Sequence, residues 1–500
     1  MRLSELFGEF KGTREGETRI TSLAIDSRQV IPGSLFFAVK GMENDGHRFI
    51  GKAVENGASA VVYSEPAKKA ENVVYIRRDD VTAEIARVSD IYNGSPSRGM
   101  TVYGVTGTNG KSTTTCIIRD ILEKCDQPCG YMGTIAVRYG NVDMKPTLTT
   151  PDSVEIQDTL RRMKEAGMRA VAMEVSSHGL ALKRTDSVDF DVAVFTNLTW
   201  DHLDFHKTMQ AYFEAKQRLF TRLKPDAVAV LNADDESFET LMRITPCRCV
   251  SYGKSEGADY RFAVTDMSAS GTRFDLTVRD TMYDVKTDLT AEYNIANLTA
   301  AIAALAETGH DLGKVVAACA NIAQVDGRME PVKNELGADI IVDYAHTPDG
   351  FSKIFEFARN VVKPGGRILA VFGSAGKRDK KKRPVLGAIA AANCDHIYLT
   401  EEDPRDERGV DIAAEIKSGI PDDKVTVIAD RREAIGAAVR DLRAGDLLLI
   451  LGKGDEKYID RGNGKDPWPG DNVEAEAAAK AVPVQQLAKP SKSAKTTMPD

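Results

Sequence analysis

The stretch Gly104-Val-Thr-Gly-Thr-Asn-Gly-Lys-Ser-Thr113 follows a short apolar segment predicted as a strand and opens a predicted helix. A glycine-rich turn in that position directs backbone N–H groups and the helix N-terminus at one place, which suits phosphate binding. Gly107 and Gly110 let the backbone approach a ligand closely. Lys111 can reach β- and γ-phosphates, and Ser112 can coordinate Mg²⁺. We therefore predict a nucleotide-phosphate loop.

The loop departs from the strict Walker pattern, which requires a glycine where this chain has Val105. The alternative interpretation is an ordinary glycine-rich turn between strand and helix. The unbroken run from Thr106 to Thr113, together with its position after a strand, favours phosphate binding.

Apolar strand-like segments alternate with helical segments on both sides of the loop, which predicts an α/β fold with a parallel, doubly wound sheet. The helix after Asp152, a predicted N-cap, is expected to end at Gly167. Residues 251–291 are richer in β-type residues and predict an antiparallel insertion. The expected strands are Ser22–Asp26, Ser34–Val39, Ala60–Tyr63, Thr101–Val105, Arg169–Val175, Val192–Thr196, Ala227–Leu231, Tyr260–Val264, Arg273–Val278, Asp339–Asp343, Arg367–Phe372, His396–Thr400 and Asp446–Leu451.

A chain of 500 residues is long enough for about three domains. The turn-rich segment 93–97 suggests the first boundary. We predict an N-terminal domain over residues 1–98, a central P-loop-type ATPase domain over 99–327 and a Rossmann-like domain over 328–473. Residues 474–500, rich in Ala, Lys, Pro and Ser, are predicted to be a flexible tail.

The composition restricts the class of protein. The net charge is −8 at pH 7, so no general basic field favours nucleic acid. No apolar run approaches the roughly 20 residues needed to span a membrane, and the acid-bearing N-terminus is unlike a signal peptide. The seven cysteines lack common zinc spacings, which suggests reduced thiols in a cytoplasmic enzyme.

Three further segments carry groups that Mg-ATP chemistry requires. Glu174 lies at the end of a predicted strand, where α/β proteins form ligand sites and where a carboxylate can hold Mg²⁺; alone it would be read as a solvated residue. In the segment 196–206, Asp201 and Asp204 are better magnesium ligands than an imidazole on physical grounds. Lys216, on a predicted amphipathic helix, would by default be a surface lysine.

The variant phosphate loop resembles that of the Mur ligase and folylpolyglutamate synthase superfamily. The resemblance implies that ATP phosphorylates a substrate carboxylate and that an amine then displaces the phosphate. It implies ATP binding by Gly107, Thr108, Asn109, Gly110, Lys111, Ser112 and Thr113, by Asn294 and Asn297 near the adenine, by Asp343 at the ribose and by Arg328 at the γ-phosphate. It also implies Mg²⁺ ligation by Ser112, Glu174, His202 and a carbamylated Lys216, with Lys111, Glu174, His202 and Lys216 as the catalytic set.

The segment 25–41 is similar to the UDP-binding stretch of the family branch that accepts a UDP-muramoyl dipeptide. That similarity implies UDP-sugar contacts from Ser27, Met42, Glu43 and Asn44, and dipeptide contacts from Thr149, Thr150, Ser176 and Arg184. Leu182 stands at a position that is polar in some relatives.

The third domain is expected to select an incoming amino acid. The resemblance implies contacts from Arg378, Glu402, Asp403, Pro404, Arg405, Gly452 and Glu456. Arg405 can bind a distal carboxylate, which meso-diaminopimelate has and lysine lacks. Asp403 and Asp455 add negative charge that favours a bare ammonium, as in lysine or ornithine. On that ground we favour lysine, with meso-diaminopimelate as the alternative.

The sequence thus predicts an ATP- and Mg²⁺-dependent ligase that adds a free diamino acid to the D-Glu carboxylate of a UDP-muramoyl dipeptide, in bacterial peptidoglycan synthesis. The resemblance suggests a monomer, while the charge and the lack of a long apolar run argue against nucleic-acid partners and membrane insertion. Two alternatives are a folylpolyglutamate-type or other amide ligase of the superfamily, and a non-catalytic ATP-binding regulatory protein.

Overall fold

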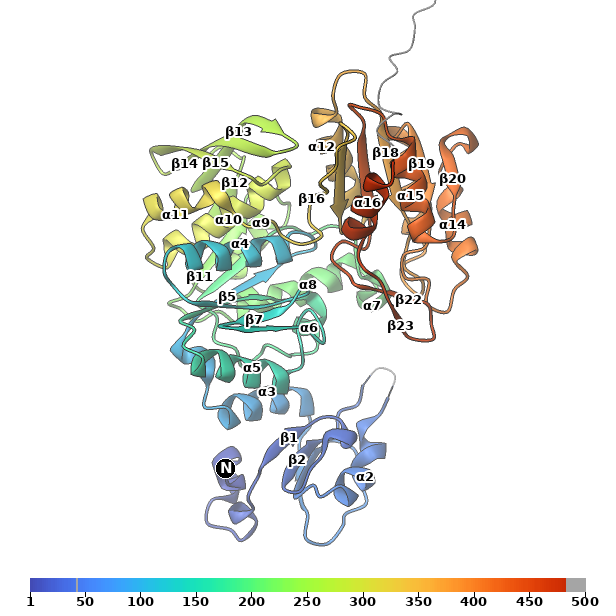
Figure 1. The fold of residues 1–500 in the computed structure, drawn as a ribbon. Helices are drawn as coiled ribbons and strands as arrows, with labels where there is room; N and C mark the ends of the chain where they lie inside the picture. Colours follow the sequence, from blue (N-terminus) through green and yellow to red (C-terminus); the bar gives the residue numbers. More distant parts are fainter. Residues whose placement is uncertain (42–43, 483–500) are drawn as a thin grey trace, which may run out of the picture.

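The computed structural model describes residues 1–41 and 44–482, arranged in three α/β units (Figure 1). The predicted fold class is confirmed: each unit has a mainly parallel sheet whose two faces carry separate apolar clusters. The predicted contacts from Met42 and Glu43 lie outside the described residues.

The N-terminal unit has four parallel strands in the order β1-β2-β3-β4. Helices α1 and α3 cover one face, and α2 covers the other. The elements are α1 Leu3–Leu6, β1 Ser22–Ala24, β2 Ser34–Phe37, α2 Ile50–Glu55, β3 Ala60–Tyr63, β4 Val74–Arg77 and α3 Val81–Tyr92.

The middle unit contains an eleven-stranded sheet in the order β15-β14-β13-β12-β11-β10-β5-β9-β6-β7-β8. The central strands, from β13 to β6, are parallel, and the outer pairs are antiparallel, as predicted for the segment after residue 251. The strands are β5 Thr101–Thr106, β6 Cys129–Met132, β7 Val137–Tyr139, β8 Val142–Met144, β9 Ala170–Glu174, β10 Val192–Phe195, β11 Val228–Asn232, β12 Arg248–Gly253, β13 Tyr260–Ser268, β14 Gly271–Val278 and β15 Thr281–Thr287.

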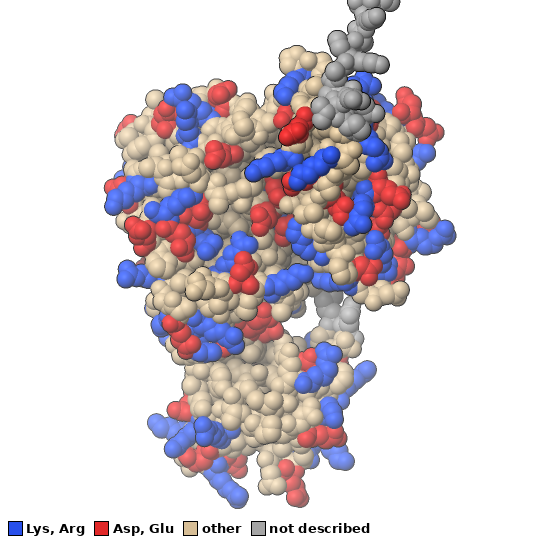
Figure 2. All heavy atoms as spheres, in the orientation of Figure 1, with Lys and Arg blue, Asp and Glu red and all other residues tan. Residues whose placement is uncertain are grey.

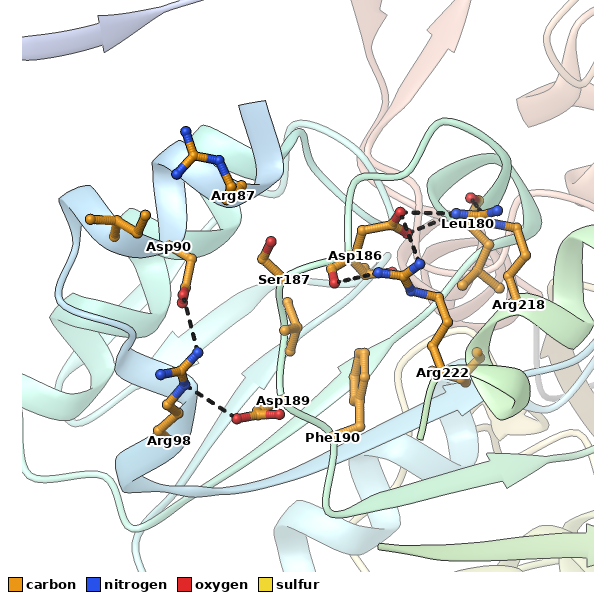
Figure 3. Close-up of a pocket in the computed structure, with 14 residues that line it drawn as sticks. Arg87, Asp90, Arg98, Leu180, Asp186, Ser187, Asp189, Phe190, Arg218 and Arg222 are labelled. Atoms are coloured by element: carbon orange, nitrogen blue, oxygen red, sulfur yellow. Dashed lines mark hydrogen bonds and ion pairs between the residues drawn. The ribbon is translucent and has the colours of Figure 1, made fainter. Parts of the chain in front are cut away.

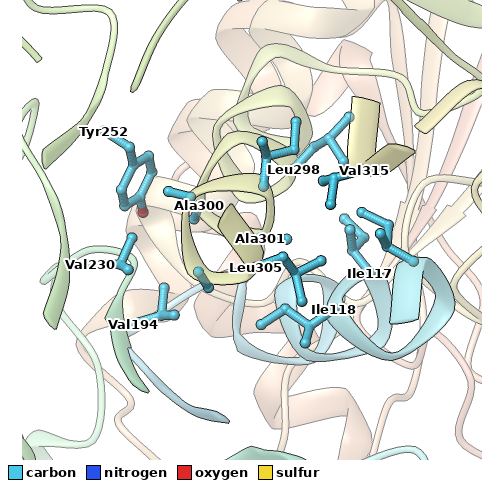
Figure 4. Close-up of a cluster of buried hydrophobic side chains, with 14 of the residues drawn as sticks. Ile117, Ile118, Val194, Val230, Tyr252, Leu298, Ala300, Ala301, Leu305 and Val315 are labelled. Atoms are coloured by element: carbon cyan, nitrogen blue, oxygen red, sulfur yellow. The ribbon is translucent and has the colours of Figure 1, made fainter. Parts of the chain in front are cut away.

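Helices cover both faces of this sheet. Helix α10 is rich in buried alanines, whose small side chains let it pack closely between α4, α11 and the strands (Figure 4). Asp152 caps α5 by accepting bonds from Val154 N and Glu155 N, as predicted. The helices are α4 Lys111–Lys124, α5 Ser153–Glu165, α6 Ser177–Ala181, α7 Leu203–His206, α8 Met209–Thr221, α9 Phe238–Ile244, α10 Glu292–Glu307 and α11 Leu312–Ala318.

The C-terminal unit has a six-stranded sheet in the order β16-β17-β21-β18-β19-β20, in which only β16 is antiparallel among the described strands. A small hairpin, β22 with β23, follows the sheet. The elements are β16 Glu330–Pro331, β17 Asp339–Asp343, α12 Pro348–Val361, β18 Ile368–Phe372, α13 Lys382–Asn393, β19 His396–Leu399, α14 Gly409–Lys417, β20 Val425–Val427, α15 Arg431–Asp441, β21 Leu447–Leu451, β22 Tyr458–Asp460, β23 Lys465–Pro467 and α16 Asp471–Lys480.

The predicted start of a flexible tail at residue 474 is wrong. Helix α16 packs on α15, with Ala475 and Ala479 buried. A fully buried ion pair joins the two helices: Arg431 Nη2 lies 2.6 Å from Asp471 Oδ2. Alanine-rich composition alone did not distinguish a packed helix from a tail, and the rest of the predicted tail lies outside the described residues.

The figures also show how charge is distributed. Lys and Arg side chains are interspersed with Asp and Glu over the visible face, without a large field of one sign (Figure 2). This agrees with the modest net charge of −8. Ligand charges must therefore be met by local groups, not by the surface as a whole.

The Asp471→Ala substitution should lower the hydrogen-exchange protection of α15 and α16 by about 3–5 kcal/mol, because it leaves Arg431 buried without its counter-charge. Lys480→Ala, which removes an exposed ion pair with Glu476, is the matched control and should change protection by less than about 0.5 kcal/mol. Equal protection in both variants would show that the pair does not hold α16.

Candidate active site

The predicted phosphate loop leaves the end of β5 and opens α4. Gly107 and Gly110 have φ angles of 153° and 86°, which disfavour other residues. A Cβ added to Gly107 would lie 1.8 Å from Thr196 Oγ1, and one on Gly110 would lie 2.4 Å from Asn297 Oδ1. The adjacent loop after β10 holds the backbone in place, because Asn109 N donates to Asn197 Oδ1 at 2.9 Å. Both glycines are thus required by close packing.

Two lysines converge on this loop. Lys111 Nζ donates to Gly107 O at 3.0 Å and to Thr108 O at 2.8 Å. Lys216 is fully buried, and its Nζ donates to Gly107 O at 2.7 Å. Burial lowers the pKa of Lys216 well below its usual value, and the nearby charge of Lys111 lowers this pKa further. The default interpretation of Lys216 as a surface lysine is therefore wrong.

Glu174, at the end of β9, is the buried carboxylate of the centre. One oxygen accepts from Ser112 Oγ at 2.9 Å, and the other accepts from Tyr131 OH at 2.9 Å and from Thr134 N at 2.8 Å. The structure therefore brings the predicted magnesium ligands Ser112 and Glu174 together. Hydroxyl and carboxylate oxygens form the donor set that Mg²⁺ prefers, so these residues fit that ion.

His202, the predicted ligand of a second metal, lies in an aromatic group with His178 and Tyr212. Burial lowers the pKa of His202 to about 3, so the imidazole is neutral and has a lone pair available. Its Nε2 lies 3.3 Å from Asp201 Oδ2. Within the described residues no three His, Cys, Asp or Glu side chains form a ready-made metal cluster. A further anionic ligand would be needed there.

Asp201 and Asp204, the ligands favoured on physical grounds, make other contacts. Asp201 Oδ2 also lies 3.9 Å from Nε2 of His346, in the C-terminal unit. Burial alone would raise the pKa of Asp201, but its interactions with the His202 and His346 rings, the charge of Lys382 and the hydrogen bond from His202 N outweigh burial and lower that pKa. Asp204 Oδ2 lies 3.4 Å from Arg378 Nη1.

The predicted nucleotide residues beyond the loop lie near the start of α10 and at the boundary with the C-terminal unit. Asn297 Nδ2 donates to Asn294 Oδ1 at 3.3 Å, and both residues are buried. Asp343 accepts from Met329 N at 2.8 Å and from Ala345 N at 2.7 Å, and burial raises the pKa of Asp343.

The residues predicted to contact the dipeptide meet beside Glu174. Thr150 Oγ1 donates to Glu174 O at 2.9 Å and accepts from Ser176 N at 2.9 Å. Arg184 Nη1 donates to Thr150 O at 2.8 Å. Thr149 Oγ1 lies 3.0 Å from Thr134 Oγ1, which links it to the same network. The four predicted residues thus lie around the end of β9, next to the phosphate loop that follows the neighbouring strand β5.

Ser27 and Asn44, the described residues of the predicted UDP-sugar set, lie in the N-terminal unit. Their hydrogen bonds stay within that unit: Asn56 Nδ2 donates to Ser27 O at 2.8 Å, and Gly41 N donates to Asn44 O at 2.9 Å. No contact in the described residues joins them to Glu174, so their role remains a prediction.

Comparison with known proteins identifies the family. Models described as "Mur ligase family, catalytic domain", "Mur ligase middle domain" and "Mur ligase, glutamate ligase domain" match residues 19–93, 105–305 and 327–454. The UDP-N-acetylmuramoyl-L-alanyl-D-glutamate--2,6-diaminopimelate ligase of Syntrophomonas wolfei is 39% identical over 449 residues, covering 88% of this chain and 91% of its own. The chain belongs to the Mur ligase family.

Solved structures agree with this assignment. A solved structure of a UDP-N-acetylmuramoyl-L-alanyl-D-glutamate--2,6-diaminopimelate ligase is similar, with a TM-score of 0.70 and 30% identity. The match covers 96% of this chain and 99% of that one. The MurF ligase from Thermotoga maritima in complex with ADP shares the fold, with a TM-score of 0.64 at 21% identity and coverage of 93% and 97%. This Mur ligase is an ATP-dependent, amide-forming ligase. Within residues 1–41 and 44–482, no helix has the length and apolarity needed to cross a membrane.

The residues predicted to contact the amino acid lie at the ends of β19 and β21. Lys453, which the sequence analysis missed, is fully buried, and its Nζ lies 2.8 Å from Asp403 Oδ1 and 2.5 Å from Glu456 Oε2. A Cβ added to Gly452 would lie 2.7 Å from Glu402 Oε2, so the predicted Gly452, Glu402, Asp403 and Glu456 do come together. Arg405 Nη1 donates to Gly376 O at 2.9 Å.

Two hydrogen bonds join the middle and C-terminal units, one from the phosphate loop and one from the loop after β10. Asn109 Nδ2 donates to Asp349 Oδ2 at 2.9 Å, and Trp200 Nε1 donates to Asp379 Oδ2 at 3.0 Å. Sequence reasoning missed Asp349 because an acid in the first turn of a helix usually needs no explanation beyond the helix dipole. Lys453 lies between two motif glycines, and that position was the available signal.

A separate cavity of about 360 Å³ lies where α3 meets the segment before β10 (Figure 3). It is lined by none of the predicted site residues. Its arginines are already paired with acids: Arg98 lies 3.4 Å from Asp189, and Arg218 lies 2.9 Å from Asp186. We therefore interpret it as part of the junction between the N-terminal and middle units.

His206 belongs to the same group of packed rings, beside His178 and Tyr212, and its lowered pKa predicts a pH dependence of stability. Burial lowers its pKa from 6.5 to about 4, and its Nε2 lies 3.0 Å from Ser177 Oγ. Below pH 6.5 the unfolded chain binds a proton at this residue that the folded chain does not, so stability falls as the pH falls toward 4.

Between pH 7 and pH 5, wild type should therefore lose about 2 kcal/mol more stability than His206→Gln. Urea unfolding followed by tryptophan fluorescence at both pH values measures this difference. An equal loss in both proteins would show that His206 does not carry the effect.

Proposed function

We propose that this Mur ligase joins meso-diaminopimelate to the D-Glu carboxylate of UDP-muramoyl-L-Ala-D-Glu. The observation that carries the proposal lies at the end of β9. There the side chain of Glu174 accepts a hydrogen bond from Ser112 of the phosphate loop, and its backbone carbonyl accepts one from Thr150. Thr150 in turn is hydrogen-bonded to Ser176 and Arg184, the other predicted dipeptide residues there. The printed names of relatives 36–40% identical to this chain support the same reaction.

In the proposed reaction the phosphate-loop backbone and Lys111 hold the ATP phosphates in line with the substrate carboxylate. A carboxylate oxygen bonds to the γ-phosphorus as the bond to ADP breaks, giving an acyl phosphate. The amine, having lost one proton to become neutral, then bonds to the acyl carbon. The tetrahedral intermediate loses a second proton from its nitrogen to solvent, and phosphate leaves as the carbonyl re-forms. Mg²⁺ held by Ser112 and Glu174 would neutralise charge on the phosphates. No protein nucleophile is needed.

The environment of Lys216 supports the proposal that it is carbamylated. Only a neutral amine reacts with CO₂, and burial favours the neutral amine of Lys216. The carbamate would supply an anionic oxygen beside the phosphate loop, in a region where the described residues have no ready-made metal cluster. We propose that this group and His202 together serve as ligands of the second metal.

Lys216→Ala should reduce turnover by about 100-fold or more, as removal of a catalytic charge-stabilising group does. Added formate or acetate should restore part of the activity by replacing the carbamate oxygen. Lys314→Ala, an exposed lysine on α11, is the control and should behave as wild type with and without added acid. Full activity of Lys216→Ala would exclude a role in metal binding.

Ion pairs made by Asp403 and Asp455 support diaminopimelate over lysine as the amino-acid substrate. Asp403 is paired with Lys453, and Asp455 Oδ1 lies 3.2 Å from Arg328 Nη1, so neither acid remains available for a bare ammonium. Arg405 lies 3.6 Å from Asp460, from Nε to Oδ2, and its Nη1 donates to Gly376 O. Its Nη2 makes no hydrogen bond within the described residues and can bind a distal carboxylate. Glu402, also buried, can take an ammonium group.

The deciding experiment measures phosphate release by the purified chain with Mg-ATP and UDP-muramoyl-L-Ala-D-Glu, separately with meso-diaminopimelate, L-lysine, L-ornithine and no amino acid. We expect release with meso-diaminopimelate, and none in Lys111→Ala. Arg405→Ala should lower kcat/KM for diaminopimelate by about 10- to 100-fold, the loss expected for hydrogen bonds to a charged group.

Arg461→Ala is the matched control, because this neighbouring arginine pairs with Glu401 and Asp466 instead. Its kcat/KM should stay near that of wild type. Turnover with lysine or ornithine alone would overturn the choice of diaminopimelate, and no turnover with any amino acid would overturn the proposed acceptor chemistry.

A further inference from the structure

The loop Gly452–Glu456 after β21 touches two sites at once. On one side Gly452 packs against Glu402, and Lys453 binds Asp403 and Glu456. On the other side Gly454 packs against the connection between the middle and C-terminal units: a Cβ on it would lie 2.8 Å from Gly327 O. The loop therefore links the amino-acid side to that connection.

Asp455 extends this link to Arg328. Its Oδ1 accepts from Arg328 Nη1 at 3.2 Å, and both side chains are largely buried, at 15% and 13% exposure. The guanidinium also lies over the ring of Tyr344, at 4.3 Å from the ring centroid. One carboxylate and one aromatic face thus determine where the Arg328 side chain lies.

The held guanidinium still has groups to offer a ligand. Within the described residues the Arg328 side chain donates two hydrogen bonds, both from Nη1, to Asp455 Oδ1 and to Gly327 O. Its Nε and Nη2 have no protein acceptor there. The Tyr344 ring lies 5.0 Å from the His346 ring, centroid to centroid, and His346 Nε2 lies 3.9 Å from Asp201 Oδ2 of the middle unit. A few residues further on, Asp349 Oδ2 accepts from Asn109 Nδ2 of the phosphate loop at 2.9 Å. Arg328 therefore packs on the segment of the C-terminal unit that borders the phosphate loop.

We propose that Asp455 is a positioning residue, which holds Arg328 with its free nitrogens toward the nucleotide phosphates and so couples the amino-acid loop to phosphoryl transfer. This inference rests on the proposed function. It replaces the expectation that Asp455 attracts the ammonium of the incoming amino acid, because the Asp455 carboxylate is already paired with Arg328.

The test compares Asp455→Asn, Arg328→Gln and the double variant in the full chain. Asp455→Asn should lower kcat by about tenfold, since misplacement of a catalytic group by a fraction of an ångström has effects of this size. The KM for the diamino acid should stay within about twofold of wild type. The double variant should be no slower than Arg328→Gln, because the two residues act through one contact.

Two further variants keep the test decisive. Asp455→Glu keeps the carboxylate and should recover part of kcat. Asp466→Asn removes an exposed acid that pairs with Arg461 and should leave kcat unchanged. A tenfold rise in KM for the diamino acid at unchanged kcat would show that Asp455 binds the amino acid and would overturn the proposal. Multiplied losses in the double variant, or wild-type kcat in Asp455→Asn, would also overturn it.

Failure of the proposed function would be recognised separately, because wild type would then release no phosphate with any diamino acid. In that case calorimetry with ADP and with a non-hydrolysable ATP analogue still tests the inference. We expect Arg328→Gln and Asp455→Asn each to weaken binding of the analogue relative to ADP by about threefold, without further loss in the double variant. An unchanged or increased preference for the analogue in Asp455→Asn would overturn it.

Discussion

The burial of Glu174 is the constraint on which the rest of the site depends. A carboxylate without exposed surface at the end of a central strand is costly unless its oxygens are satisfied, and here Ser112, Tyr131 and Thr134 satisfy them. Those partners come from α4, β6 and the turn after β6. The arrangement therefore fixes the first turn of α4, and with it the phosphate loop, against the neighbouring strand.

The same constraint explains why the site joins parts far apart in the chain. Strands β5, β9 and β10 are parallel neighbours, so their carboxyl ends meet at one edge of the sheet. The fully buried Lys216 reaches that edge from α8, and the C-terminal unit reaches it through Asp349 and Asp379. The middle and C-terminal units thus meet beside the phosphate loop.

Much of this arrangement was predictable from local sequence. Apolar segments of strand length located the central sheets, and the glycine spacing at Gly107 and Gly110 located the phosphate loop, because both signals depend on short stretches of chain. Long-range pairing was not predictable. Lys453 neutralises Asp403 from a point 50 residues away, so the charge of the proposed amino-acid pocket could not be obtained by counting acids in one motif. Helix α16 was missed for the same reason, since its partner Arg431 lies 40 residues earlier.

The hydrogen bonds from Asn109 to Asp349 and from Trp200 to Asp379 have a consequence for efficiency. An acyl phosphate is lost if water reaches it before the amine does. The walls around the proposed intermediate belong to two units, so shielding from solvent exists only while those units stay together. The yield of product per ATP consumed then depends on how long this contact survives compared with the time the amine needs to attack. Weakening it would waste ATP through hydrolysis even if every catalytic group stayed in place.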